Sequence, residues 1–194
     1  MKWQLISKSG KRVIEVKKDE EVGVVLAVDK GGCYEVGVEL KERGARALIL
    51  GVVLGKGQYK AKIIMETRHW VSNTHAETII YGTNRDESET ELKGLIKIDK
   101  KANQVTDFLT AKVLLLSDRA RATVEPGLEI KSDEVRASHA ATVAAIDEEQ
   151  IYYLMSRGLE RLESERLIAD GFFQVIINKI DNVKIRKQIC LKLK

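Results

Sequence analysis

The feature that most constrains the fold of this chain is a period-two alternation of apolar and polar residues over residues 12–144. Val36, Val38 and Leu40 alternate with charged or small residues, and residues 89–98 alternate in the same way. Successive side chains of a strand point to opposite faces, so the pattern predicts many short strands, each with one buried and one solvated face. No helical stretch separates them, which excludes the alternating strand–helix order of Rossmann and TIM-barrel folds.

The segments between the predicted strands favour a solenoid over a sandwich or a barrel. Asn-Gly and Asp-Gly, the usual signals of a tight hairpin, are absent from the strand region. The strands are punctuated instead by single glycines or short charged segments such as residues 41–44. This arrangement is typical of coils that stack in one dimension.

After Ala144 the apolar period changes to about 3.6 residues, which predicts helices. Asp147 is a suitable N-cap, and Gly158 is a suitable residue just beyond a C-terminus. We expect further helices through residues 162–168, after a bend at Gly171 through residues 172–180, and over a basic stretch at 181–194. The sequence therefore predicts a β-solenoid core over residues 1–145 and a small α-helical subdomain over residues 146–194.

Composition limits which kinds of partner the protein can bind and indicates the cellular compartment in which it is found. Lys and Arg number 33 against 29 Asp and Glu, so the net charge of +4 comes from interspersed charges and does not indicate nucleic-acid binding. No segment has the roughly 18 consecutive apolar residues of a membrane span, and the first residues lack a signal peptide, so we expect a cytoplasmic protein. Cys33 and Cys190 are expected to be reduced thiols that behave as small buried hydrophobes.

Common catalytic and cofactor motifs are missing from the sequence. Residues 51–56 are one residue too short for a phosphate loop, and the dinucleotide, zinc-protease and zinc-ribbon patterns do not occur. His69 and His75 flank a turn and are interpreted as surface or strand-end residues. His139 follows a strand at residues 134–138, where the sheet gives way to the helical tail, and is of more interest as a ligand.

Five short motifs occur in register along the second half of the chain. They are Val113-Leu114-Leu115-Leu116-Ser117-Asp118, Pro126-Gly127-Leu128-Glu129-Ile130, Ser138-His139-Ala140-Ala141-Thr142-Val143, Tyr153-Leu154-Met155-Ser156-Arg157-Gly158 and Gly171-Phe172. Together they resemble the closing half of the SufB/SufD family of iron–sulfur cluster assembly scaffolds. Gly82 to Asp107 is similar but looser.

The resemblance implies a right-handed parallel β-helix followed by helices, and a non-catalytic scaffold. In the family, SufB and SufD form a scaffold with the ABC-type ATPase SufC, which docks on the helical tail. We therefore expect a SufC-like partner on the tail, and a SufB-like subunit or a second copy of the chain on the β-helix near residues 124–138. The residues expected to contact the ATPase are Tyr153, Leu154, Arg157, Gly158, Leu167, Ile168, Gly171 and Phe172.

Two departures from the SufB pattern place the chain nearer to SufD. Ala120 stands where SufB-type members carry a cysteine, and Ala140 stands where they carry a glutamate after the histidine. The resemblance then leaves His139 as a weak iron ligand at a subunit interface. We expect no stably bound cofactor, and at most a transient iron or iron–sulfur cluster.

Two alternatives come from other functional classes. A β-helix enzyme acting on polysaccharide would need clustered carboxylates on one solvated face, where Glu89 and Glu91 are the candidates. The other alternative is a purely structural interaction module.

Overall fold

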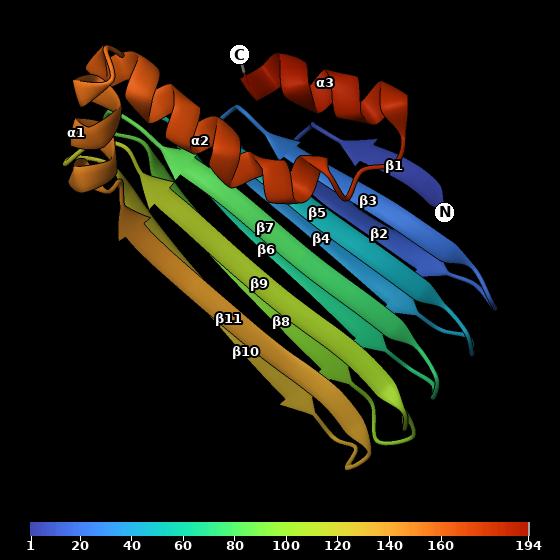
Figure 1. The fold of residues 1–194 in the computed structure, drawn as a ribbon. Coiled ribbons are helices and arrows are strands. Elements are labelled where there is room, and N and C mark those ends of the chain that lie inside the picture. The colour runs from blue at the N-terminus through green and yellow to red at the C-terminus, as the bar shows by residue number, and fades with distance from the viewer. Residues whose placement is uncertain (194) are drawn as a thin grey trace.

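The structure, a computed structural model, describes residues 1–193. Within residues 1–193, eleven strands precede three helices (Figure 1). The elements are β1 Lys2–Ile6, β2 Gly10–Val16, β3 Glu21–Val28, β4 Gly32–Leu40, β5 Arg46–Gly55, β6 Lys60–His69, β7 His75–Asn84, β8 Glu89–Ile98, β9 Val105–Leu115, β10 Arg121–Ile130, β11 Val135–Ala145, α1 Glu148–Ser156, α2 Arg161–Ile177 and α3 Val183–Leu193.

The strands divide by parity into two sheets, because the chain crosses from one sheet to the other at every turn. Odd-numbered strands form a sheet in the order β1-β3-β5-β7-β9-β11, and even-numbered strands form one in the order β10-β8-β6-β4-β2. All the strand pairs within the described residues are parallel. The predicted parallel β-helix is confirmed.

Inward-facing side chains of both sheets fill the solenoid, as the period-two pattern predicts. Val36, Val38 and Leu40 of β4 are buried, and so are Leu92, Ile96 and Ile98 of β8, while the residues that face the other way are partly exposed. Burying one such side chain is worth about 1.5–3 kcal/mol. The main core therefore runs the length of the solenoid between the two sheets.

Residues with left-handed backbone conformations form a column at one set of turns. Asp19, Gly44, Asn73 and Gln104 have φ values of 53°, 79°, 60° and 55°. Backbone hydrogen bonds join the successive turns, as from Gly44 N to Asn73 O at 2.9 Å. A Cβ atom at Gly44 would lie 2.0 Å from Asp19 Oδ1, so only glycine fits both the conformation and the space.

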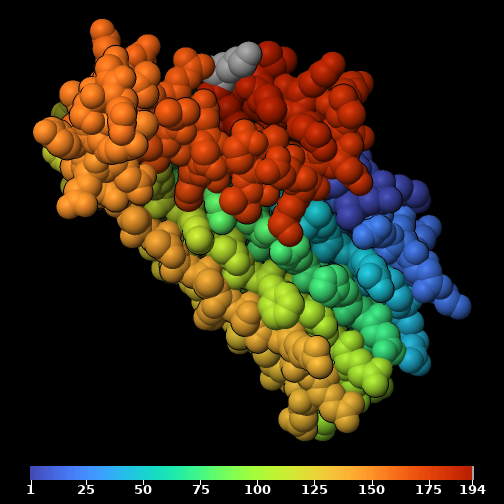
Figure 2. All heavy atoms as spheres, in the orientation of Figure 1, coloured from blue at the N-terminus to red at the C-terminus, as the bar shows by residue number. Residues whose placement is uncertain are grey.

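The helical tail packs on the outer face of the odd-numbered sheet and forms a second core there. Val25, Leu50 and Tyr81 point outward from β3, β5 and β7 and meet apolar side chains of α2 and α3. Figure 2 shows the tail lying across one end of the strands and leaving β9 and β11 largely uncovered. The tail residues buried in this second core are Phe173, Ile176, Ile177, Ile180, Ile185 and Ile189.

The ends of α1 agree with the sequence, but the second and third predicted helices are one. Asp147 caps α1 by accepting from Glu149 N at 2.9 Å, and Gly158 follows the C-cap with φ 95°. The predicted bend at Gly171 is wrong, because α2 continues through it. A glycine inside a helix costs about 1 kcal/mol, which the packing of Phe173 and Ile176 on the sheet outweighs.

The turn column gives a prediction about stability. Gly44→Ala and Gly57→Ala both place a side chain at positive φ, at a cost of about 1–2 kcal/mol. A Cβ at Gly57 meets nothing within 4 Å, whereas Gly44→Ala must also displace Asp19, which adds about 1–3 kcal/mol. Urea unfolding should show the larger loss for Gly44→Ala. Equal losses in the two variants would contradict this account of the column.

Candidate functional site

The solenoid ends in two edge strands, β10 and β11, which no other strand of the described residues covers. Every interior strand has a neighbour on each side, but the outer edges of β10 and β11 keep unpaired backbone groups. Leu128, Ile130 and Val143 are large apolar residues exposed there. This open end therefore offers backbone hydrogen bonds and apolar surface together.

His139 lies in the middle of β11 and is exposed. It is paired in register with Leu109, which is buried in the main core, so both side chains point to the same face of the odd-numbered sheet. The sequence placed His139 where the sheet meets the tail. The structure instead places it six residues before the end of the last strand, over the open end of the main core.

Neither of the two positions that depart from the SufB pattern shares the strand face of His139. Ala120 is fully buried in the turn before β10. Ala140 is exposed, but it follows His139 in the strand and so points to the opposite face. Among residues 1–193, no three His, Cys, Asp or Glu residues gather as a metal site would require.

The first two helices of the tail carry exposed apolar and aromatic side chains. Tyr152 and Tyr153 are 76% and 57% exposed, and Met155 of the same helix is also exposed. Leu162 and Leu167 add to this surface from α2. Exposed apolar and aromatic side chains on neighbouring helices are typical of an interaction site.

Among the expected ATPase-contact residues, most are at least partly exposed. Tyr153, Arg157, Gly158, Leu167 and Gly171 are exposed. The Arg157 guanidinium lies 5.3 Å from the centre of the Tyr153 ring, a cation–π distance. Leu154 and Ile168 have intermediate exposure.

Phe172 differs from the rest of that set because it contacts the solenoid. Its ring stacks on Tyr81 of β7 with centroids 4.6 Å apart, and Phe172 packs against the second core. The contact fixes α2 on the odd-numbered sheet. Phe172 thus supports the helix that carries Leu167 and Gly171.

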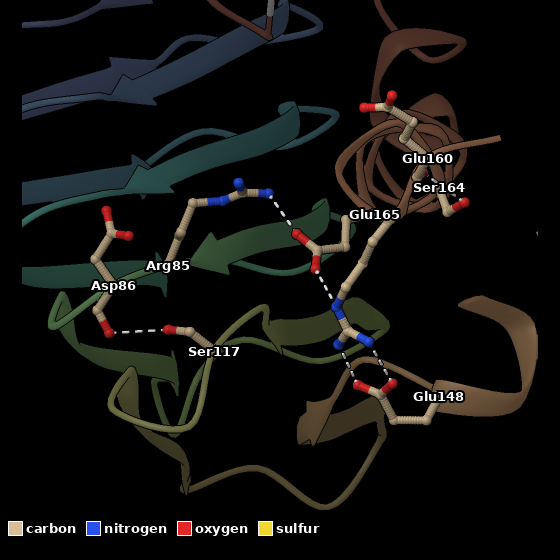
Figure 3. Close-up of polar contacts among 8 residues, drawn as sticks. Arg85, Asp86, Ser117, Glu148, Glu160, Ser164 and Glu165 are labelled. Atoms are coloured by element: carbon tan, nitrogen blue, oxygen red, sulfur yellow. Dashed lines mark hydrogen bonds and ion pairs between the residues drawn. The ribbon is translucent and has the colours of Figure 1, made fainter. Parts of the chain in front are cut away.

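A chain of alternating arginine and glutamate side chains joins the solenoid to both helices (Figure 3). Arg85, in the turn between β7 and β8, donates to Glu165 of α2 at 3.0 Å. Arg161 donates to the other oxygen of Glu165 at 3.2 Å and forks to both oxygens of Glu148 in α1, at 2.6 and 2.9 Å. The hydrogen bonds from Arg161 hold the pKa of Glu148 below its ordinary value.

A buried polar cluster occupies the main core near the turn after β6. His69 is at a strand end as expected, but it is completely buried and not on the surface. Its Nε2–H donates to Asp107 Oδ2 at 3.0 Å, because a carboxylate can only accept, and Nδ1 lies 2.7 Å from Thr74 Oγ1. Thr67 donates to the same carboxylate oxygen at 2.5 Å. Burial of the imidazole is tolerated because each of its nitrogens has a hydrogen-bond partner.

His75 and the two cysteines lie away from these surfaces. His75 lines a hollow of about 630 Å³ on the flank of the solenoid, with Glu21 and Arg46. Both thiols are free, as expected. Cys33 is exposed on β4, so its expected burial is wrong, and Cys190 has intermediate exposure. An outward position on the solvated face of the even-numbered sheet explains the exposure of Cys33.

Sequence reasoning missed the charge chain and part of the apolar surface. The i, i+4 spacing of Arg161 and Glu165 was a readable signal, but nothing local to Arg85 indicates its partner 80 residues later. The exposure of Tyr152 and Met155 follows only from knowing which face of α1 is buried, and that is the face of Ile151.

None of the helices within residues 1–193 is long and apolar enough to cross a membrane.

Comparison with known proteins agrees with a β-helix that is followed by helices. Residues 15–172 match the family model described as SUF system FeS cluster assembly, SufBD core domain. The chain is 33% identical to the iron–sulfur cluster assembly protein SufD of Bacillus subtilis over 138 residues, which is 71% of this chain and 32% of that protein. It is 28% identical to SufB of the same organism over 160 residues, and 28% identical to SufD of Escherichia coli over 138 residues.

These matches cover 80% and 67% of this chain, respectively, and 32% of each relative. The chain thus spans about a third of the length of the curated relatives it matches. The family model covers most of the solenoid and continues into α2. The chain therefore belongs to the SufB/SufD family of iron–sulfur cluster assembly proteins and is SufD-like.

Proposed function

We propose that the chain is a non-catalytic scaffold subunit for iron–sulfur cluster assembly in the cytoplasm, and that a SufC-like ABC-type ATPase docks on α1 and the first half of α2. The observation that carries the proposal is the set of exposed apolar side chains on these helices, of which Tyr152, at 76%, is the most exposed. Aromatic residues of this kind dominate the binding energy of protein interfaces. The surface lies inside the part of the chain that was expected to dock the ATPase.

The open end supports a second partner, either a SufB-like subunit or another copy of this chain. The unpaired edges of β10 and β11 can continue the sheets across an interface, and Leu128, Ile130 and Val143 supply apolar area. A two-fold axis near residues 124–138 would pair like strands from two copies. Both forms of partner use the same surface.

The cluster itself is the cargo of such a scaffold, and this chain offers few donors for it. His139 can contribute one imidazole nitrogen at the open end, where a partner would contribute the rest. With alanine at positions 120 and 140, one copy lacks the thiolate and carboxylate that iron–sulfur chemistry uses. We therefore propose transient binding of iron or a cluster between subunits.

The surroundings of the two carboxylates considered for a polysaccharide-cleaving enzyme favour a scaffold function over that enzyme. Glu89 and Glu91 are ion-paired with Lys60 and Lys62, at 2.9 and 2.8 Å. The hydrogen bond from Lys62 holds the pKa of Glu91 below its ordinary value, whereas a glycosidase general acid needs a raised pKa. Their geometry is that of a solvated ion-pair ladder.

Replacing the two exposed tyrosines should weaken ATPase docking without unfolding the protein. We expect Tyr152→Ala with Tyr153→Ala to raise the Kd for the host's SufC-like ATPase by about 30-fold or more, as calorimetry can measure. Leu191→Ala, an equally exposed position on α3, is the control. Substitution is preferable to deletion of the tail, since α2 and α3 cover the second core. Unchanged binding in the double variant would refute docking on α1.

The open end should mediate self-association when no other partner is present. We expect a dimer by light scattering at micromolar concentration, and a monomer for Leu128→Glu, which places a charge in the proposed interface. Val13→Glu is the matched control, because Val13 is an exposed apolar residue on β2 at the opposite edge of the same sheet. A monomeric unaltered chain would rule out the homodimer. A monomeric Val13→Glu variant would place the interface at the β2 edge and not at the open end.

His139→Ala should reduce cluster formation without affecting assembly of the complex. The side chain is exposed, so the variant should keep its unfolding midpoint and its affinity for the ATPase. We expect a lower yield of cluster in a reconstituted complex, followed by the absorbance of the iron–sulfur chromophore. His75→Ala, on the flank of the solenoid, should form cluster normally. Normal yield from His139→Ala would remove the ligand role.

A further inference from the structure

The ion chain Arg85–Glu165–Arg161–Glu148, called the charge chain below, links the solenoid to the two helices of the proposed docking surface (Figure 3). It connects a turn of the solenoid first to α2 and then to α1. Glu165 is the central member, because its two oxygens accept from two different arginines. Its side chain is only 11% exposed, so these hydrogen bonds are shielded from solvent.

The apolar contacts of the tail lie elsewhere, toward its C-terminal half. The tail residues that pack in the second core, from Phe172 onward, belong to the last two turns of α2 and to the segment that follows. Of the α1 residues, Ile151 is the buried one, and it is not part of the second core. Ile151 is 1% exposed, so α1 also has an apolar anchor, and the charge chain adds ionic links that join the solenoid to the first half of α2 and α2 to α1.

The chemistry of the charge chain suits orientation more than it suits stability. The guanidinium of Arg161 presents a planar fork that matches the carboxylate of Glu148 at two points, so it fixes an angle as well as a distance. Exposed pairs of this kind add little to the free energy of unfolding. Glu165 is different, because a nearly buried carboxylate that loses a partner is costly.

The turn that holds Arg85 is itself fixed. Arg85 N donates to Gly55 O at 3.0 Å in the preceding coil. Its neighbour Asp86 accepts from Gly57 N through its carboxylate and from Ser117 Oγ through its carbonyl, both at 2.8 Å. Three successive turns are thereby joined, so Arg85 projects from a rigid base.

We propose that Arg85 and Glu165 are positioning residues for the docking surface, which hold α1 and the start of α2 in the orientation that the ATPase recognises. This inference rests on the proposed function. A surface held in its binding orientation binds more tightly than one that samples several, because the apparent Kd is the intrinsic Kd divided by the fraction in the competent state. The charge chain thus contributes affinity without contacting the partner.

Arg85→Met tests the inference, since it removes the solenoid end of the chain and leaves Glu165 paired with Arg161. In the isolated protein we expect amide hydrogen exchange in α1 to quicken by about tenfold while the core strands stay protected. The Kd for the ATPase should rise by a similar factor, and Arg85→Lys, which keeps the charge, should recover part of both losses.

Lys179→Met is the matched control. It breaks a different ion pair between tail and solenoid, from Lys179, two residues beyond α2, to Glu77 at 2.9 Å, where apolar packing already fixes the chain. Neither the exchange of α1 nor the Kd should change in this variant.

The outcomes separate the inference from the proposed function. Unchanged exchange in Arg85→Met, with the ATPase still bound by the unaltered chain, would overturn the positioning role alone. Faster exchange with an unchanged Kd would also overturn it, because the orientation would then not matter for docking. If the unaltered chain does not bind the ATPase, the proposed function fails, and the positioning of a docking surface fails with it.

Discussion

Parallel backbone ladders, locked in register from coil to coil, are the constraint on which the rest of this structure depends. Each strand satisfies its backbone groups only through the coil before it and the coil after it. The coils must therefore have matching lengths, and the turns must superimpose. The left-handed residues Asp19, Asn73 and Gln104 and the glycine at position 44 follow from that demand. So does the open end, because the final coil has no successor.

The second core explains why the tail lies on one sheet and not the other. Val25, Leu50, Val52, Ile79 and Tyr81 give the outer face of β3, β5 and β7 an apolar surface, whereas the outer face of the even-numbered sheet is joined by ion pairs such as Lys62–Glu91 and Lys97–Glu66. Apolar surface must be covered, while a paired charged face is stable in water. Helices α2 and α3 cover the first face, and Lys179–Glu77 and Lys192–Asp29 fasten them at its margin.

The sequence predicted the strands well because the alternation of apolar and polar residues within each strand shows which side chains are buried. Alternation identified the strands, and the absence of hairpin signals identified the solenoid. The position of the tail on the odd-numbered sheet was harder to predict. The sequence did contain one signal, since residues 22–28 and 47–53 are nearly continuous apolar runs of the kind found in strands buried on both faces. Their partners lie more than 100 residues away, and periodicity carries no information about which distant helix covers a strand.

The same limit applied to single residues whose environment is set by a neighbouring coil. His69 was placed at a strand end, but its burial depends on Asp107 in the facing sheet. Cys33 was expected inside because cysteines are usually buried, yet its register on β4 turns it outward. At Gly171 local propensity predicted a bend, and tertiary packing kept the helix straight. In each case the deciding contact is distant in sequence.

The path from the open end to the docking surface is short, because α1 begins three residues after β11 ends. Between them, Ile146 is buried and its N–H donates to Leu115 O at 2.8 Å, which ties the linker to the solenoid. Helix α1 is thus held to the solenoid at its start by an apolar and backbone contact, and through α2 by the charge chain. Salt weakens an exposed pair such as Arg161–Glu148 more than it weakens the bonds of the nearly buried Glu165 or the apolar contact. Ile151 of α1 is also almost fully buried, so apolar packing places the helix, and on the proposal above the charge chain sets its orientation.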